Sequence, residues 1–304
     1  MKTVEQIVAQ KSEKKRITML TAYDYPIASL VDEAGIDIIL VGDSLANVVL
    51  GLESTTEVGM KEMLHHTKAV VRGVKNALVI GDMPFESYQL NPQAAVDNAR
   101  QFIEQGCHAV KLEWFEDCPK VASAIVQAGI AVMGHVGLTP QTAQKMGGMK
   151  VQGREAASAQ AIIENAKQLQ DSGCFSIVLE CIPQEVAKLI TEQLKISTIG
   201  IGAGPYCDGQ VLVIHDLLGL CRRFQPKFSK KYVDLGPQIL EAVLQYKQEV
   251  ITGQFPDDAH SFHIDPSLLP VIPAPINVIP AKAPPIDGAP PKAVAGIHHK
   301  NNLK

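Results

Sequence analysis

Four acidic residues each follow a run of aliphatic residues. The runs are "IDIILVGD", "ALVIGD", "AVKLE" and "FSIVLE", and they end at Asp43, Asp82, Glu113 and Glu180. Such aliphatic runs are typical of strands buried on both faces of a parallel sheet. A charge is disfavoured in the apolar core, so each carboxylate should lie at the end of its strand, where the strand leaves the core. Because parallel strands end on the same side of their sheet, we predict that the four carboxylates lie together around one opening, the mouth of the site, at the carboxyl ends of the strands.

Carboxylates that lie close together repel one another. We therefore predict a cation between them that neutralises this repulsion. Oxygen ligands without paired histidines or cysteines favour Mg²⁺ over zinc. Magnesium commonly takes one or two carboxylates and leaves positions for water and substrate. A 2-oxo acid could occupy two of these positions. The cation would then stabilise the enolate that forms when a base removes the neighbouring proton.

Further polar residues lie close to these carboxylates in the sequence. Lys111 stands two residues before Glu113 and therefore shares its face of the strand, where it could bind a substrate carboxylate or an oxyanion. His135 ends another run, either as a substrate contact or as a hydrogen-bonded core histidine. Asp43 and Ser44 could instead cap a helix. Four carboxylates together with a lysine favour a site over capping.

The elements that must position these residues alternate regularly along the chain. Short β-like runs cover residues 17–24, 36–43, 77–84, 109–114, 131–137, 175–181, 197–204 and 211–216. Helical patterns cover residues 91–106, 153–173, 182–194 and 237–253. Eight strands alternating with helices predict an α/β protein, a (β/α)8 TIM barrel. The alternative is a doubly wound open sheet, but no strand leads into a GxGxxG helix entry.

The composition narrows the class of protein. The chain has 304 residues, 46% hydrophobic and 20% charged, as globular proteins do. A formal net charge of −4 argues against a nucleic-acid partner. No apolar run approaches the roughly 20 residues that span a bilayer, and the charged N-terminus lacks a signal-peptide core. We therefore expect a cytoplasmic enzyme that acts on small molecules and has no membrane partner.

The end of the chain differs from the rest. Residues 265–304 are rich in proline, which removes amide donors and resists helix and sheet. We predict two parts, a catalytic barrel over residues 1–264 and a flexible tail over residues 265–304. Alternatively, the valines and isoleucines of the tail could dock on a neighbouring subunit.

The motifs together resemble the 3-methyl-2-oxobutanoate (ketopantoate) hydroxymethyltransferase family. The matching segments run in order over about residues 3 to 264 and include "ITMLTAYD", "ILVGDSLANVVLG", "AVKLE", "GHVGLTPQ", "GGMKVQGR" and "TIGIGAGPYCDGQVLVIHDLLG". The resemblance implies a barrel of the phosphoenolpyruvate mutase/isocitrate lyase superfamily. It also implies Mg²⁺, a homodecamer and the first committed step of pantothenate biosynthesis.

The implied reaction moves a hydroxymethyl group from 5,10-methylenetetrahydrofolate to 3-methyl-2-oxobutanoate, which gives 2-dehydropantoate. By motif, the residue roles that the resemblance implies are magnesium ligation by Asp43, Asp82 and Glu113 (the last direct or through water), oxo-acid binding by Asp43, Ser44, Asp82 and Lys111, and proton abstraction by Glu180. The independent argument from strand ends gives the carboxylates, the cation and the enolate. The folate and the identity of the oxo acid come from the resemblance alone.

The chain departs from the family pattern at several positions. Leu52 in "LGLESTTEVGMKEM" and Met149 in "GGMKVQGR" each replace an aromatic residue. None of the departures removes a proposed catalytic group. Two other functions compete, a carbon–carbon lyase of the same superfamily and a non-catalytic oligomeric barrel. The lyases usually carry a "KxCGH"-type loop, which this sequence lacks, and the intact acidic residues argue against a non-catalytic protein.

Overall fold

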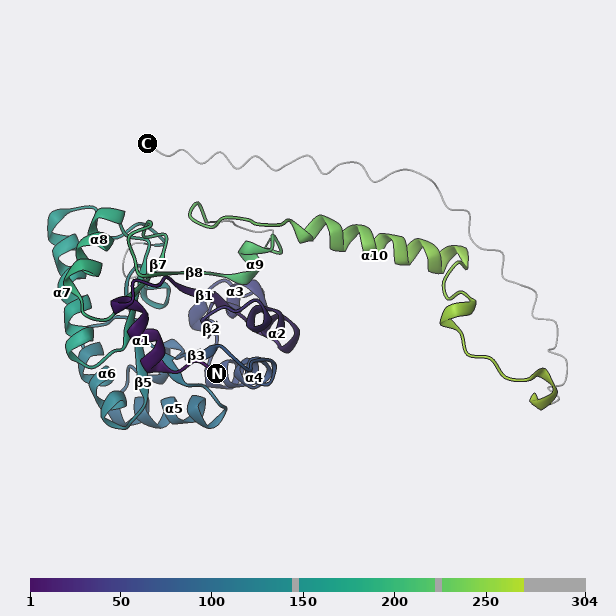
Figure 1. Cartoon of the computed structure of the whole chain (residues 1–304), viewed down its shortest axis with the longest axis horizontal. Coiled ribbons are helices and arrows are strands. Elements are labelled where there is room, and N and C mark those ends of the chain that lie inside the picture. Colours follow the sequence, from purple (N-terminus) through teal and green to yellow (C-terminus); the bar gives the residue numbers. More distant parts are fainter. Residues whose placement is uncertain (144–147, 222–225, 271–304) are drawn as a thin grey trace. The chain divides into compact units, whose positions relative to one another are not determined.

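The computed structural model describes residues 1–143, 148–221 and 226–270, and its centre is a closed barrel of parallel strands (Figure 1). Each strand pairs with the next along the chain, and the last pairs with the first. The strands are β1 (Ile17–Thr21), β2 (Ile38–Val41), β3 (Leu78–Asp82), β4 (Ala109–Lys111), β5 (Ala131–Gly137), β6 (Ser176–Glu180), β7 (Ser197–Ile201) and β8 (Gly209–Leu212). The predicted (β/α)8 barrel is confirmed.

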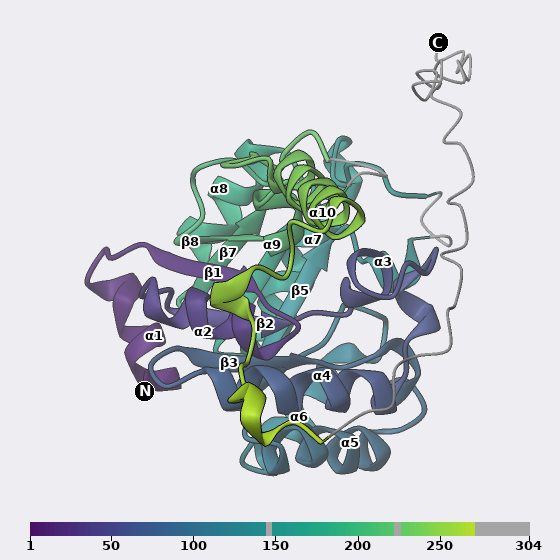
Figure 2. The ribbon, with the colours of Figure 1, turned by 90° about the vertical axis from the view of Figure 1, so that its right-hand side faces the viewer.

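Helices surround the barrel and separate most successive strands (Figure 2). They are α1 (Val4–Ser12), α2 (Tyr25–Glu33), α3 (Leu45–Val48), α4 (Met60–Gly73), α5 (Pro92–Glu104), α6 (Cys118–Gln127), α7 (Ala156–Asp171), α8 (Gln184–Gln193) and α9 (Ile214–Leu217). The described chain has one later α-helix, α10 (Leu235–Thr252), which is not part of this layer. Within the described residues, none of these helices is both long and apolar enough to cross a bilayer.

Helix α5 illustrates how local sequence signals fix these elements. The Asn91 side chain caps the helix by accepting from the amide of Ala94 at 2.8 Å, and Pro92 occupies the first turn, where its missing N–H costs nothing. Phe102 on the inner face packs against β3 at Gly81, where a Cβ would lie only 2.3 Å from the Phe102 ring. The glycine therefore lets helix and strand approach closely.

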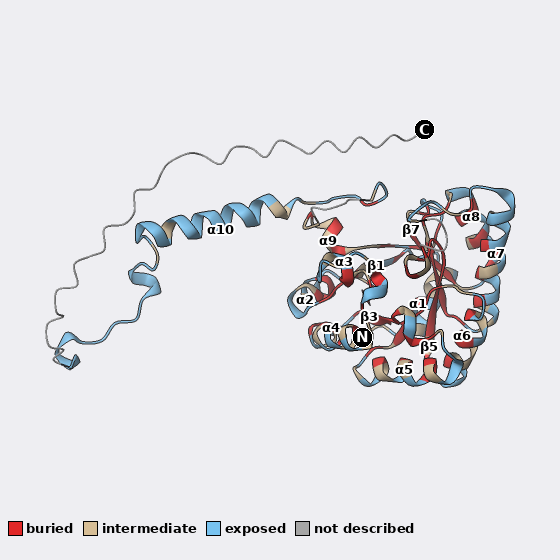
Figure 3. Ribbon diagram, turned by 180° about the vertical axis from the view of Figure 1, so that it is seen from behind, coloured by how far each residue is buried: buried red, intermediate tan, exposed pale blue. Residues whose placement is uncertain are grey.

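Most of the apolar core falls into two layers, and the buried residues lie mainly on the strands and on parts of the surrounding helices (Figure 3). One fills the space between strands and helices. The other fills the barrel interior with residues from the strand starts, among them Ile38, Leu78 and Ala109. This inner layer closes the amino-terminal end of the barrel, so polar side chains inside the barrel gather at its carboxyl end.

One predicted strand is placed differently by the structure. Residues 211–216 were expected to be extended, but β8 ends at Leu212 and Ile214 begins the short helix α9. The amide of Ile214 donates to the hydroxyl of Thr21 at 3.0 Å, which fixes this turn against β1. A buried aliphatic run does not by itself distinguish a strand from one turn of helix, so periodicity could not locate the boundary.

The chain divides into two compact units, residues 1–245 and 246–304. The barrel lies in the first. The predicted helix at 237–253 is present as α10, which spans the division and has no buried residue. Most of the predicted tail, residues 271–304, lies outside the described residues. The boundary expected between residues 264 and 265 therefore stays a prediction.

Candidate active site at the mouth of the barrel

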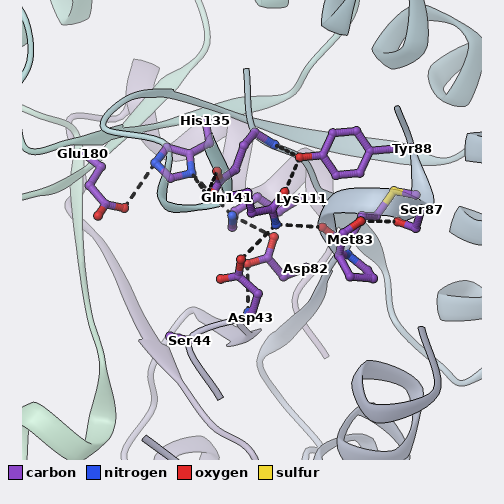
Figure 4. A network of polar contacts seen from close by, with 12 residues as sticks. Asp43, Ser44, Asp82, Met83, Ser87, Tyr88, Lys111, His135, Gln141 and Glu180 are labelled. Carbon is purple, nitrogen blue, oxygen red and sulfur yellow. Dashed lines mark hydrogen bonds and ion pairs between the residues drawn. The ribbon is translucent and has the colours of Figure 1, made fainter. Parts of the chain in front are cut away.

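A cavity of about 410 Å³ opens at the carboxyl ends of the strands. Its lining contains every residue that the sequence singled out, namely Asp43, Ser44, Asp82, Lys111, Glu113, His135 and Glu180. They come from β2, β3, β4, β5 and β6 and the residues that directly follow these strands. The structure thus brings together side chains that lie far apart in the sequence (Figure 4).

Lys111 is the buried cation of this cluster. Its Nζ lies 2.7 Å from Oδ1 of Asp82, and Oδ2 of the same carboxylate accepts from the amide of Asp43 at 3.1 Å. Burial raises the pKa of Asp82 to about 8, although Lys111 opposes this. Burial would lower the pKa of Lys111, but Asp82, Glu113 and Asp43 raise it above its ordinary value. These carboxylates therefore favour the ammonium form of Lys111.

His135 lies between two carboxylates. Its Nε2 is 3.2 Å from Oε2 of Glu180, and its Nδ1 is 3.5 Å from Oε1 of Glu113. Burial and Lys111 would lower the pKa of His135, but its hydrogen bonds to Glu113 and Glu180 raise it to about 9. The raised pKa favours the protonated form of His135, which attracts both carboxylates. Direct contact with substrate stays a prediction.

Ser44 occupies the N-cap position of α3, yet its side chain makes no capping hydrogen bond. Its hydroxyl lies 2.8 Å from the hydroxyl of the buried Tyr23. The geometry therefore does not support the alternative in which Ser44 caps a helix. It leaves a hydroxyl in the cavity lining whose orientation is fixed by Tyr23.

Sequence reasoning missed two residues that hold the cluster in place, Gln141 and Tyr88. The Gln141 amide nitrogen donates to Oδ2 of Asp43 at 2.9 Å and to the carbonyl of Met83 at 3.1 Å. Its backbone amide donates to Oε2 of Glu113 at 3.0 Å. The Tyr88 hydroxyl donates to the Gln141 side-chain oxygen and accepts from the amide of Glu113. One glutamine thus ties together carboxylates from two strand ends.

The charge of the site fits a divalent cation. Asp43, Asp82, Glu113 and Glu180 line the cavity with only two basic side chains of the described residues, Lys111 and His135, so the acidic groups outnumber the basic ones. Among the described residues, no three histidine, cysteine, aspartate or glutamate side chains form a ready metal cluster. Asp43 and Asp82 alone suffice for Mg²⁺, which usually completes its shell with water and substrate. Both Glu113 oxygens face protein donors, so its direct ligation of the metal stays a prediction.

The barrel and its acidic mouth define the class of this protein, an α/β-barrel enzyme with the fold of the phosphoenolpyruvate mutase/isocitrate lyase superfamily. Two solved structures share the fold. Phosphonopyruvate hydrolase, in complex with oxalate and Mg²⁺, matches with a TM-score of 0.57 and 13% identity over 86% of this chain and 93% of that one. The superfamily member 2,3-dimethylmalate lyase matches with a TM-score of 0.56 and 14% identity over 86% of this chain and 92% of that one.

The family itself follows from sequence comparison. Residues 1–258 match the model of ketopantoate hydroxymethyltransferase, so the chain belongs to this family of transferases. A 3-methyl-2-oxobutanoate hydroxymethyltransferase from Syntrophomonas wolfei is 53% identical over 268 residues, which are 88% of this chain and 97% of that protein. One from Syntrophobacter fumaroxidans is 56% identical over 261 residues, 86% of this chain and 92% of that protein. The predicted family is confirmed.

Proposed function

We propose that this enzyme transfers a hydroxymethyl group from 5,10-methylenetetrahydrofolate to 3-methyl-2-oxobutanoate and so forms 2-dehydropantoate for pantothenate biosynthesis. One observation carries the proposal beyond family membership. A buried ammonium group and an acidic pair, Asp43 and Asp82, line the same cavity as Glu180, which His135 holds in place. This arrangement offers an anion site, a cation site and a base to one small oxo acid.

Asp43 and Asp82 would hold Mg²⁺, and Glu113 would contribute directly or through water. When bound, the cation withdraws electron density from the keto group and makes the hydrogen on C3 more acidic. Lys111 supplies a fixed positive charge for the substrate carboxylate or for the developing oxyanion. The Ser44 hydroxyl, oriented by Tyr23, donates a hydrogen bond to the bound acid.

Glu180 then removes the proton from C3. Its side chain is 14% exposed, more than those of Asp82 or His135, so it can reach a substrate in the cavity. The electron pair of the broken C3–H bond forms a new bond to the methylene carbon of the folate, while the bond from that carbon to one of its two folate nitrogens breaks and this nitrogen takes up a proton. Water then replaces the second folate nitrogen on the same carbon, so that the water oxygen becomes the hydroxyl group of the product and a water proton goes to the released nitrogen of tetrahydrofolate.

A direct assay tests the reaction. The protein is incubated with Mg²⁺, 3-methyl-2-oxobutanoate and 5,10-methylenetetrahydrofolate, and the mixture is analysed by mass spectrometry. We expect 2-dehydropantoate to accumulate in proportion to enzyme. Folded, magnesium-loaded protein that forms no product would refute the proposed function.

The resemblance also predicts a homodecamer, and the composition predicts a cytoplasmic protein that binds neither nucleic acid nor membrane. Light scattering coupled to gel filtration measures the mass of the assembly directly. A mass of ten chains, each of 32.8 kDa, is the expected result. Any other mass would separate the assembly of this chain from that of the family.

A further inference from the structure

The mouth contains one buried carboxylate that the chemistry above does not use. Asp216 belongs to α9, directly after β8, and lines the same cavity as Glu180. The residue is 8% exposed. Within the described part of the chain, its carboxylate has no hydrogen-bond or ion-pair partner. Burying an unpaired carboxylate costs free energy, so the presence of an aspartate at position 216 needs an explanation.

The order of the strands places Asp216 a quarter of the ring from Asp43 and a quarter of the ring from Glu180. In the closed barrel, β8 is two strands away from β6, which ends at Glu180, and two strands away from β2, which precedes Asp43. Tyr23 connects the two sides, because its hydroxyl contacts Ser44 and its ring lies 5.4 Å from that of His215. Asp216 thus stands beside the reaction site and outside the cluster around Lys111.

The cavity wall around Asp216 is mainly apolar. Its lining on β7, β8 and the segments that follow β8 is formed by Ile201, Val211, Val213 and Phe228. Lys111 is the only lysine or arginine among the described residues of the lining, and it is paired with Asp82 on β3. Burial raises the pKa of Asp216, and no cation among the described residues forms an ion pair with it. A ligand that supplies N–H donors would satisfy this carboxylate.

The two substrates of the proposed reaction differ in this respect. The oxo acid is itself an anion without any N–H group, so it cannot satisfy Asp216. The pterin ring of the one-carbon donor carries a ring N–H beside an amino group, and two parallel N–H donors match the two oxygens of a carboxylate. The faces of that ring also suit an apolar wall.

We propose that Asp216 is the pterin-binding residue of this enzyme. Its carboxylate accepts hydrogen bonds from the ring N–H and the 2-amino group, while the apolar wall contacts the ring faces. This inference rests on the proposed function, because it takes its ligand from that reaction. It assigns the co-substrate to the β7–β8 side of the mouth and leaves the β2–β4 side to the oxo acid and the metal.

Two measurements test the binding of the folate and the chemistry of the oxo acid separately. Tetrahydrofolate binding is measured by calorimetry for the wild type and for Asp216→Asn, which replaces one acceptor with a donor. Deuterium exchange at C3 of 3-methyl-2-oxobutanoate is measured in D₂O with Mg²⁺ and without folate. We expect Asp216→Asn to raise the dissociation constant for tetrahydrofolate by about tenfold or more. Its exchange rate should stay within about twofold of the wild type, since hydrogen bonds to folate do not act in that step.

Two controls make the result specific. Glu53→Gln removes another carboxylate of the cavity lining and should leave tetrahydrofolate affinity unchanged. A tetrahydrofolate analogue with hydrogen in place of the 2-amino group needs no mutation, and it should bind the wild type about tenfold more weakly. Wild-type affinity in Asp216→Asn, an equal loss in Glu53→Gln, or full affinity for the analogue would each overturn the assignment. Absent C3 exchange in the wild type would count against the proposed function instead, while the binding comparison still tests Asp216.

Discussion

Lys111 and His135 carry the positive charge that keeps a crowded group of carboxylates in place. Asp82 contacts the lysine at 2.7 Å, and Glu180 contacts the histidine at 3.2 Å. Lys111 thus faces a carboxylate that is proposed to hold the metal, and His135 faces the carboxylate that is proposed as the base. The two proposed roles therefore fall to carboxylates with different basic neighbours.

The first prediction concerns the base. Glu180→Gln keeps the size of the side chain and its contact with His135 but removes the proton acceptor. We expect C3 deuterium exchange of 3-methyl-2-oxobutanoate to fall by at least about 100-fold, the usual contribution of a general base. Magnesium affinity should change little, because Glu180 is not among the proposed ligands. Exchange at the wild-type rate would assign the base to another residue.

The second prediction concerns Gln141. Gln141→Met preserves the length of the side chain but removes both hydrogen bonds of its amide nitrogen and the acceptor for Tyr88. We expect weaker Mg²⁺ binding by calorimetry, and a stability loss of about 1–3 kcal/mol from the groups left unsatisfied.

A matched control for this variant is Gln160→Met. The Gln160 amide also donates to a carboxylate, that of Glu164 at 3.0 Å, but on the exposed surface of α7. The Gln160→Met variant should change neither the Mg²⁺ affinity nor the stability measurably, since exposed contacts of this kind contribute little. Equal Mg²⁺ affinity in the wild type and Gln141→Met would show that Gln141 does not position Asp43.

The sequence could locate residues at strand ends but not those in turns. Asp43, Asp82 and Glu180 each follow a recognisable aliphatic run, so strand periodicity places them at the mouth. Gln141 lies in a short 3-10 turn, and Tyr88 follows another, where no periodic pattern operates. Only the tertiary contacts reveal their role. The available signal was the position of Gln141 within the motif "GHVGLTPQ".

Among the elements, the junction between α2 and β3 depends on one carboxylate. Asp32 near the end of α2 accepts hydrogen bonds from the amides of Lys75, Asn76 and Ala77, at 3.0, 2.9 and 2.7 Å. These residues precede β3, which ends at Asp82. Asp32 therefore fixes the entry of a strand whose other end belongs to the site.

The third prediction concerns this junction. Burial opposes ionisation of Asp32, but hydrogen bonds from Ala77, Lys75 and Asn76 lower its pKa below the usual value. Its stabilising contribution is therefore complete above the unfolded pKa of about 3.9 and is lost as the pH falls through the lower folded pKa. We expect Asp32→Ala to cost about 1–3 kcal/mol at pH 7.

Urea unfolding of both proteins at pH 7 and at decreasing pH below 4 measures this difference. The gap between wild type and Asp32→Ala should narrow as the pH falls, because the wild-type carboxylate becomes protonated. A gap that stays constant down to the acid limit would show that the charge of Asp32 contributes nothing to this junction.

At the scale of the whole molecule, the barrel was predictable because many signals agree. Continuous aliphatic runs, helical spacing between them and charges at strand ends all indicate a parallel sheet with its site on one side. Ring closure is different, because nothing in the sequence of β1 or β8 states that they are neighbours. That pairing joins Ile17 to Gly209, and it depends on the geometry of all eight strands.

The pairing of β1 with β8 has a consequence for how the chain folds during its synthesis on the ribosome. All of the predicted metal, substrate and base residues lie before residue 181, so they leave the ribosome before β8 exists. Until then, β1 and the strand last added present unpaired backbone edges, which favour aggregation. Lys11 of α1 lies 2.8 Å from Asp208, just before β8, and so joins the first helix to the last strand. Synthesis of this short late segment converts an exposed sheet into a closed protein.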